Sequence, residues 1–229
     1  MQSILSAWQR RSRTTTRIFT KAFFRLLGGV NAILQRDEKY GIKRGYHHAL
    51  RTVEFDDRLN KDEWQKDTYQ FAASIMMSNN YTSVVDVGCG SAYKLLNLLG
   101  TCQTTGIELE STFRWLAGKY PDRNWLQFEK AEPDNLETDL VICVDVIEHC
   151  EDPRILLDFI KCIRADRVLI STPERDEVAG RRDFGPPRNI HHYREWNSQE
   201  FKKFISKYFY IEQHLIFKDR SATQVVLCK

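Results

Sequence analysis

The sequence predicts an α/β domain whose central sheet is mostly parallel and closes with a C-terminal antiparallel hairpin. Beyond residue 60, short apolar runs alternate with helical patterns, as in a parallel sheet covered by helices. The run Ser83–Val87 is β-branched and apolar, as expected of a strand buried on both faces. Near the end of the chain, a short polar turn joins the strand-like runs 208–217 and 222–228, which predicts the hairpin.

The order of the other elements predicts that the earlier strands are parallel, because helical patterns separate most of them. A helix over 61–78 precedes the first strand, since aromatic and aliphatic residues recur there at helical spacing. The remaining predicted elements are helices near 92–99, 112–119 and 153–163, and strands near 104–108, 125–128, 139–145 and 167–171.

The turn after the first strand has the pattern of a ligand-binding loop. Gly88 and Gly90 allow a sharp turn and a close approach of backbone to ligand. The free amide groups at the start of the helix over 92–99 would point at that ligand. Tyr93 replaces the third glycine of a dinucleotide fingerprint, and neither Ser nor Thr follows Lys94 as a phosphate loop requires. The sequence therefore predicts a nucleotide-type ligand outside these two classes.

The pattern Asp86-x-Gly88-x-Gly90 resembles motif I of the class I S-adenosylmethionine-dependent methyltransferases. The resemblance implies a Rossmann-like sheet of seven strands with S-adenosyl-L-methionine as cofactor. It also implies that the glycine turn cradles the methionine end and that Asp86 helps to hold the amino group. Glu108 ends the second predicted strand, 22 positions after Asp86, where an acid can accept the ribose hydroxyls. Glu110 is the alternative, as a solvated charge in a first helical turn.

Three polar residues follow the fourth predicted strand, at the edge where ligands bind in such sheets. Asp145, Glu148 and His149 resemble the strand-end motif of the ubiquinone-biosynthesis type O-methyltransferases. We assign Asp145 to the cofactor site and Glu148 and His149 to catalysis, with His149 as a general base that Glu148 orients. No metal is assigned, but Mg²⁺ or Zn²⁺ held by the three residues is an alternative. A helix start capped by Asp145 is another.

A long polar stretch follows the fifth predicted strand, and loops of this length usually bind ligands or act as lids. Its segments 172–175 (Thr-Pro-Glu-Arg), 185–189 (Gly-Pro-Pro-Arg-Asn) and 192–196 (His-Tyr-Arg-Glu-Trp) resemble methyltransferases associated with glycan and cell-envelope biosynthesis. The resemblance spans about residues 60–217 and makes His192 a second candidate for the catalytic base.

The same stretch also has a structural interpretation that is compatible with catalysis. Asn197 or Ser198 can cap a following helix, with Glu200 in its first turn and Trp196 packed beneath. Arginines of this region can pair with a phosphate or carboxylate on the substrate, although most are expected to be solvated. These arginines are Arg175, Arg181, Arg182, Arg188 and Arg194.

The charge of the chain divides it into two predicted parts. Residues 1–36 carry seven basic and no acidic side chains, whereas the remainder carries 27 basic and 31 acidic ones. Apolar residues recur at helical spacing in this first stretch, so we predict a basic amphipathic arm over 1–45 and the enzyme domain over 46–229. The arm can pack on the domain as a lid, lie on an anionic membrane, or act as an organelle transit peptide. Nucleic acid is not expected, because no recognition module accompanies the basic patch.

These observations together predict a methyltransferase that acts on an oxygen of a sugar or glycolipid by in-line transfer with a histidine base. One alternative is methylation of a phenolic or quinone precursor with the help of a metal. Another is a cofactor-binding module without catalysis that is recruited to membranes. The six cysteines lack C-x-x-C spacing, which is typical of reduced thiols in the cytoplasm, so we expect a cytoplasmic protein with peripheral membrane contact through residues 1–36.

Overall fold

The computed structural model describes residues 39–53, 55–58, 64–218 and 222–229. The predicted amphipathic helix and its membrane contact through residues 1–36 lie outside the described residues. Among the residues that are described, no helix combines the length and apolar character needed to cross a membrane.

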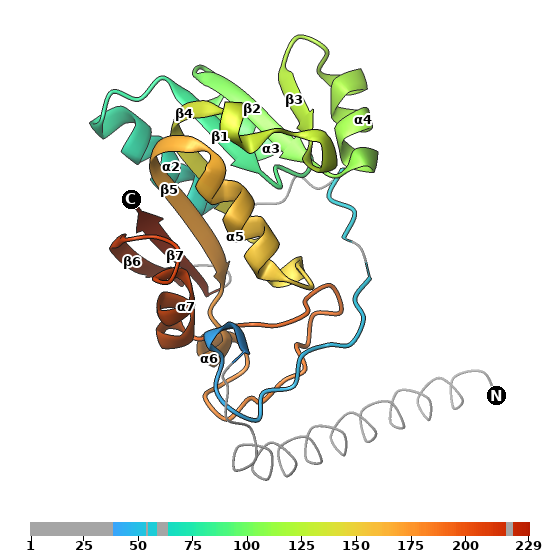
Figure 1. Ribbon diagram of the computed structural model, residues 1–229, viewed down its shortest axis with the longest axis vertical. Helices are drawn as coiled ribbons and strands as arrows, with labels where there is room; N and C mark the ends of the chain where they lie inside the picture. Colours follow the sequence, from blue (N-terminus) through green and yellow to red (C-terminus); the bar gives the residue numbers. More distant parts are fainter. Residues whose placement is uncertain (1–38, 54, 59–63, 219–221) are drawn as a thin grey trace, which may run out of the picture.

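In the described part of the chain, one seven-stranded sheet has the strand order β3-β2-β1-β4-β5-β7-β6 (Figure 1). The first five strands pair in parallel, and β7 lies antiparallel between β5 and β6. The predicted fold, a mostly parallel sheet with a terminal antiparallel hairpin, is confirmed. The strands are β1 (Ser83–Val87), β2 (Gln103–Glu108), β3 (Asn124–Gln127), β4 (Glu137–Val144), β5 (Arg164–Pro173), β6 (Ile211–Phe217) and β7 (Thr223–Cys228).

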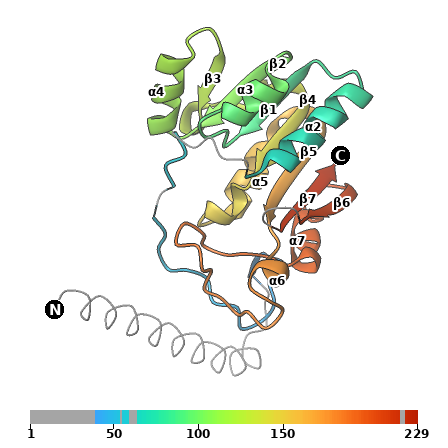
Figure 2. The same ribbon diagram turned by 180° about the vertical axis from the view of Figure 1, so that it is seen from behind.

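Helices cover both faces of the sheet (Figures 1 and 2). The side chains of Val85 and Val87 pack in the core beneath α5 and α7, whereas Val84 packs in the core beneath α2 and α3. This alternation along a buried strand gives the sheet two apolar faces. The helices are α2 (Lys66–Ser78), α3 (Tyr93–Leu99), α4 (Glu110–Lys119), α5 (Pro153–Cys162), α6 (Arg175–Val178) and α7 (Ser198–Ile205), with 3-10 turns η1 (Lys39–Gly41), η2 (Phe128–Lys130), η3 (Pro133–Asn135) and η4 (Ile147–His149).

Two segments that are distant in the sequence lie side by side next to the carboxyl ends of the strands (Figures 1 and 2). They are residues 39–53 and the loop 179–197, which joins α6 to α7. Backbone amides of His47, Ala49 and Val53 donate hydrogen bonds across to this loop. The pairing closes the loop over the strand ends and thereby positions its polar residues.

The described end of the predicted arm contacts the rest of the domain. Tyr40 and Ile42 are buried in the core beneath α5 and α7. The backbone amide of Lys43 donates a hydrogen bond of 3.0 Å to Oε1 of Glu200 at the start of α7. Residues 39–45 therefore pack against the domain, although the sequence pattern grouped them with the arm.

Candidate active site

A cavity of about 740 Å³ opens at the carboxyl ends of the strands, a volume typical of small-molecule sites. The glycine turn after β1 forms one of its walls. Gly88 has φ 81° and Gly90 has φ 55°, which side chains rarely tolerate. An added Cβ on Gly88 would lie 2.4 Å from Cγ2 of Val146, and one on Gly90 would lie 2.0 Å from Oδ2 of Asp57. Both the backbone conformation and the space at the turn therefore require glycine.

Glu108, at the end of β2, lies in the cavity wall beside the glycine turn. Its Oε1 accepts a hydrogen bond of 2.7 Å from the amide of Gly90, and its Oε2 accepts one of 2.9 Å from the amide of Leu109. These contacts hold the Glu108 carboxylate at the cavity beside the glycine turn. Glu110 is instead half exposed and pairs with Arg114.

Asp86 lies beneath the glycine turn, and the cavity wall does not include it. The side chain is fully buried, and its Oδ2 accepts a hydrogen bond of 2.8 Å from the hydroxyl of Tyr69 on α2. Burial raises the pKa of Asp86 to about 7, although the Tyr69 hydrogen bond lowers it. Oδ1 of Asp86 has no hydrogen-bond partner among the described residues. The contact of Oδ2 with Tyr69 ties α2 to β1, two residues before the glycine turn.

Asp145 follows β4 and lines the cavity, as the sequence interpretation expects. Its φ of 54° is unusual for a residue with a side chain. The hydroxyl of Ser171 donates a hydrogen bond of 2.6 Å to its Oδ1 and holds it there. The turn Ile147–His149 that follows has no side-chain cap, so the structure does not support the alternative in which Asp145 caps a helix start.

Glu148 lies at the floor of the cavity and is fully buried. Its Oε2 accepts a hydrogen bond of 3.0 Å from the hydroxyl of Thr172, whereas its Oε1 has no hydrogen-bond partner among the described residues. Burial, together with the nearby charge of Asp145, raises the pKa of Glu148 well above its usual value. A buried carboxylate oxygen without a partner is costly, which suits a ligand-binding position.

His149 lies beside Glu148, but Glu148 does not orient it as the sequence interpretation expected. Nδ1 of His149 is 2.9 Å from the carbonyl oxygen of His191, so Nδ1 carries the proton and donates it there. Nε2 therefore keeps its lone pair. Burial, and secondarily the charge of His192, lowers the pKa of His149 to about 4, which keeps the ring neutral at physiological pH.

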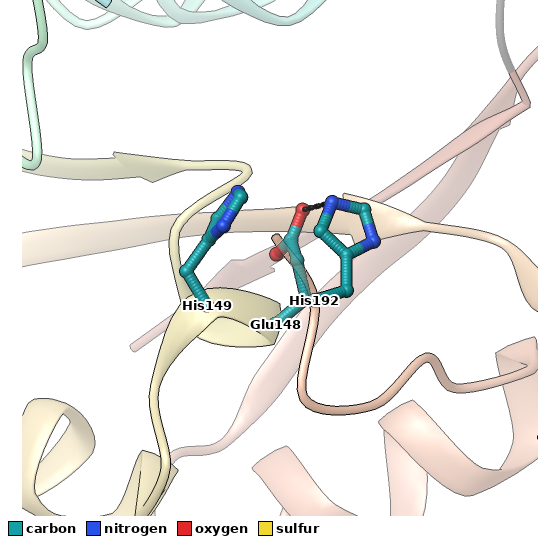
Figure 3. Close-up of side chains that lie close together, drawn as sticks. All are labelled: Glu148, His149 and His192. Carbon is teal, nitrogen blue, oxygen red and sulfur yellow. Dashed lines mark ion pairs between the residues drawn. The ribbon is translucent and has the colours of Figure 1, made fainter. Parts of the chain in front are cut away.

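His192 reaches the same point from the loop 179–197 (Figure 3). Its Nδ1 lies 2.8 Å from Oε1 of Glu195, and its Nε2 lies 4.0 Å from Oε1 of Glu148, beyond hydrogen-bond distance. One ligand atom each from Glu148, His149 and His192 can be chosen so that all three lie within 4.8 Å of one another. We call these three residues the Glu-His-His cluster. The structure thus brings together the three residues assigned to catalysis.

The helix cap predicted at Asn197 or Ser198 is confirmed for Asn197, which forms a capping box with Glu200. Asn197 accepts from the amide of Glu200, and the Glu200 carboxylate accepts from the amide of Asn197. Two of the arginines that were considered for substrate binding are instead bound to the protein. Arg175 is fully buried and pairs with Glu200, and Arg194 donates hydrogen bonds of 2.6 Å to two backbone carbonyls. Arg188 is the member of the set that lines the cavity.

Several residues of the site were not predicted from the sequence. Tyr69 lies on α2, and Gln65 directly precedes that helix; both line the cavity. Phe55 stacks on His149, with ring centroids 6.0 Å apart. These residues belong to segments without a recognisable motif. The sequence pattern included Glu195 only as part of the segment 192–196. Its position three residues after His192 could have indicated the contact between the two side chains.

Comparison with known proteins identifies the family. The family model described as "Methyltransferase domain" matches residues 35–215. No curated protein sequence matches the chain.

Solved structures share the fold at low sequence identity. The methyltransferase domain of bacterial CtHen1-C has a TM-score of 0.56 and 24% identity, over 72% of this chain and 97% of that chain. The plantazolicin methyltransferase BpumL, solved with a desmethylPZN analogue and SAH, has a TM-score of 0.53 and 15% identity, over 72% of this chain and 82% of that chain. The [4+2]-cyclase SpnF has a TM-score of 0.58 and 12% identity, over 80% of this chain and 87% of that chain.

The cyclase in this group illustrates that the fold alone does not define a reaction. The family model is therefore the stronger finding, since it covers both the glycine turn and the Glu-His-His cluster. The chain belongs to the methyltransferase-domain family, and it is a class I S-adenosylmethionine-dependent methyltransferase.

Proposed function

We propose that the protein transfers a methyl group from S-adenosylmethionine to a hydroxyl oxygen of an acceptor bound against the Glu-His-His cluster. The observation that carries the proposal is that this cluster and the glycine turn line one cavity. A cofactor over the turn and a hydroxyl at the cluster would then be neighbours. Methyl transfer needs this alignment, the exclusion of water and the removal of one proton.

The cavity residues suit the cofactor. The turn at Gly88 and Gly90 lines the cavity where the methionine end would lie, and the carboxylate of Glu108 lies beside it, where the ribose hydroxyls would bind. Asp145 supplies a carboxylate near the positive sulfonium and ammonium groups. Asp86 acts from below by holding the turn in place through Tyr69.

A divalent cation at the Glu-His-His cluster explains the geometry better than a metal-free base at His149, although the sequence interpretation preferred the base. A group with a pKa of about 4 is a weak base for a hydroxyl, but its neutral imidazole is a good metal ligand. Oε1 of Glu148 has no hydrogen-bond partner among the described residues, and Nε2 of His149 carries a lone pair because Nδ1 donates. Both are electron-pair donors, and a cation would bind them together. Two imidazoles and a carboxylate suit Zn²⁺ and similar ions, which when bound lower the pKa of a coordinated hydroxyl.

The second candidate mechanism is a metal-free base at His192. The contact of its Nδ1 with Glu195 favours this candidate, because a ring that donates from Nδ1 carries its lone pair on Nε2. Methyl transfer should be measured as S-adenosylhomocysteine released, before and after chelation and after return of Zn²⁺, Mn²⁺ or Mg²⁺. Loss with chelation and recovery with one ion supports the cation, whereas full turnover after chelation supports His192. Cofactor binding without any transfer would instead support a non-catalytic module.

For the acceptor, we favour a sugar carried on a lipid over a free sugar or a phenol. Apolar side chains line the cavity although they are substantially exposed: Phe55 is 47% exposed, Ile155 63% and Val178 42%. Such a patch around a polar centre suits a molecule with both hydroxyls and an apolar body. Labelled methyl donor incubated with a glycolipid extract should label a lipid-soluble product. Label confined to water-soluble sugars or to phenols would contradict this choice.

Membrane attachment through residues 1–36 would deliver the enzyme to such an acceptor. The proposal is supported by the seven basic and no acidic side chains of this stretch. The full chain should sediment with vesicles that contain anionic lipid and not with neutral ones, and a variant that lacks residues 1–36 should not sediment. Equal sedimentation of both proteins would remove the proposal without affecting the chemistry.

A further inference from the structure

Glu195 is buried beside the Glu-His-His cluster but has no assigned role. It is 4% exposed, and its Oε1 lies 2.8 Å from Nδ1 of His192. An ionised carboxylate accepts hydrogen bonds and cannot donate them, so Nδ1 of His192 carries the proton in this contact.

A second contact fixes the same tautomer from the other side of the ring. Nδ2 of Asn189 lies 2.9 Å from Nε2 of His192. Oδ1 of that amide accepts a hydrogen bond of 3.0 Å from the amide of His191, so the NH₂ group faces the ring. Because the NH₂ group donates, Nε2 must hold the lone pair. Both neighbours therefore require the Nδ1–H form of His192.

The backbone of Glu195 is held rigidly. Its amide donates a hydrogen bond of 3.0 Å to the hydroxyl oxygen of Tyr46, and its carbonyl accepts one of 3.1 Å from Arg175. Arg175 is itself fully buried and makes two hydrogen bonds to Glu200, at 2.6 and 3.0 Å. A carboxylate on such a support can hold a neighbouring ring in one orientation.

We infer that Glu195 is a positioning residue that fixes the ring and tautomer of His192, so that Nε2, which accepts from Asn189, carries its lone pair beside Glu148. This inference deepens the proposed function and rests on it for its catalytic consequence. The positioning itself concerns only the contacts within the protein. It applies to both candidate mechanisms, since a cation or a substrate proton would take the Nε2 lone pair in place of the Asn189 N–H, and each needs that lone pair.

The test is the imidazole ¹⁵N spectrum of His192, with its signals assigned by their loss in His192→Gln. The wild-type protein should show a protonated Nδ1 and an unprotonated Nε2. Glu195→Leu should shift the ring toward a mixture of tautomers, because the acceptor is lost. Glu195→Gln keeps a carbonyl oxygen and should restore Nδ1–H. Glu129→Leu, an exposed glutamate on η2, serves as the control and should leave the spectrum unchanged.

Enzyme activity provides a second, independent measurement. Glu195→Leu should lower kcat by about 10- to 100-fold with an unchanged Kd for S-adenosylmethionine, and Glu195→Gln should recover most of kcat. A wild-type ring protonated on Nε2, or a Glu195→Leu protein with normal tautomer and kcat, would overturn the inference. The wild-type spectrum keeps the test decisive even when the leucine variant fails to fold. The expected tautomers in a protein without any methyl transfer would contradict the proposed function alone.

Discussion

Single residues determine whether the cofactor can approach the turn after β1. At Gly88, a methyl group would meet Cγ2 of Val146 at 2.4 Å, on a backbone with φ 81°. Gly88→Ala should therefore weaken S-adenosylmethionine binding at least about tenfold, which corresponds to roughly 1.4 kcal/mol. Isothermal titration calorimetry measures this directly.

Gly118→Ala is the matched control, because a methyl group there would meet no atom within 4 Å. It lies within helix α4, so the substitution should leave cofactor affinity unchanged and stabilise the fold by up to about 1 kcal/mol. Equal affinities for all three proteins would mean that the cofactor does not approach the turn at Gly88.

The buried carboxyl of Asp86 predicts a pH dependence of stability. Its folded pKa of about 7 lies above the unfolded value of 3.8, so the folded state binds more protons between these two values. The stabilisation that Asp86 contributes is therefore fully present below about pH 4 and is lost as the pH rises through 7. The free energy of unfolding falls by up to about 1.4 kcal/mol per pH unit in this range. Asp86→Asn should raise the melting temperature at pH 8 and change it less at pH 5.

Asp139 provides a control of opposite sign. Backbone amides of Thr82 and Ser83 donate to its carboxylate and lower its pKa, so its contribution is lost as the pH falls. Asp139→Asn should destabilise the protein at neutral pH and have less effect in acid. A variant Asp86→Asn that melts lower than wild type at pH 8 would contradict a raised pKa at that site.

The sequence predicted some site residues better than others, for a physical reason. The position of Glu108 was predictable because parallel strands end at a common edge, so an acid at the end of the second strand lies at the cavity there. The contact between Glu195 and His192 depends on a loop conformation without periodicity. The position of Asp86 depends on Tyr69, whose helix has no sequence signal that relates it to the first strand.

At the scale of elements, the start of α7 connects the fold to the site. The side chain of Asn197 accepts from the amide of Glu200, and Glu200 also binds Arg175 beneath Glu195. Asn197→Ala should lower the free energy of unfolding by about 0.5–2 kcal/mol, because the cap is lost. Chemical denaturation measures this change.

Ser206→Ala, at the other end of α7, is the control, since its hydroxyl makes only an exposed bond to the carbonyl of Lys203. It should change stability by less than about 0.5 kcal/mol. Similar losses in the two variants would show that the cap contributes nothing specific.

Strand positions were predictable, but their ends were less so. Three valines give Ser83–Val87 a clear strand pattern, and the predicted bounds match β1. By contrast, β5 begins at Arg164, three residues before the predicted start, because Glu137 and Thr138 of β4 pair with polar or small partners there. Pairing between strands extends an element past its apolar run, and a pattern based on hydrophobicity does not detect this extension.

At the scale of the whole molecule, the strand order creates the site. The chain passes from β1 outward to β2 and β3, and then returns to place β4 on the other side of β1. This switch point leaves a crevice above β1 and β4, where the glycine turn and the Glu-His-His cluster meet. The resemblance to the family predicted seven strands and the terminal hairpin, but not this order. The packing of 39–53 on the loop 179–197 was not predictable, because neither segment is periodic.

The most direct test of the account is a crystal structure of the protein with S-adenosylhomocysteine. The account predicts the ribose hydroxyls on Glu108, the homocysteine end over Gly88 and Gly90, and the sulfur facing the Glu-His-His cluster. An adenosine bound away from Glu108, or a sulfur separated from the cluster by protein, would contradict it.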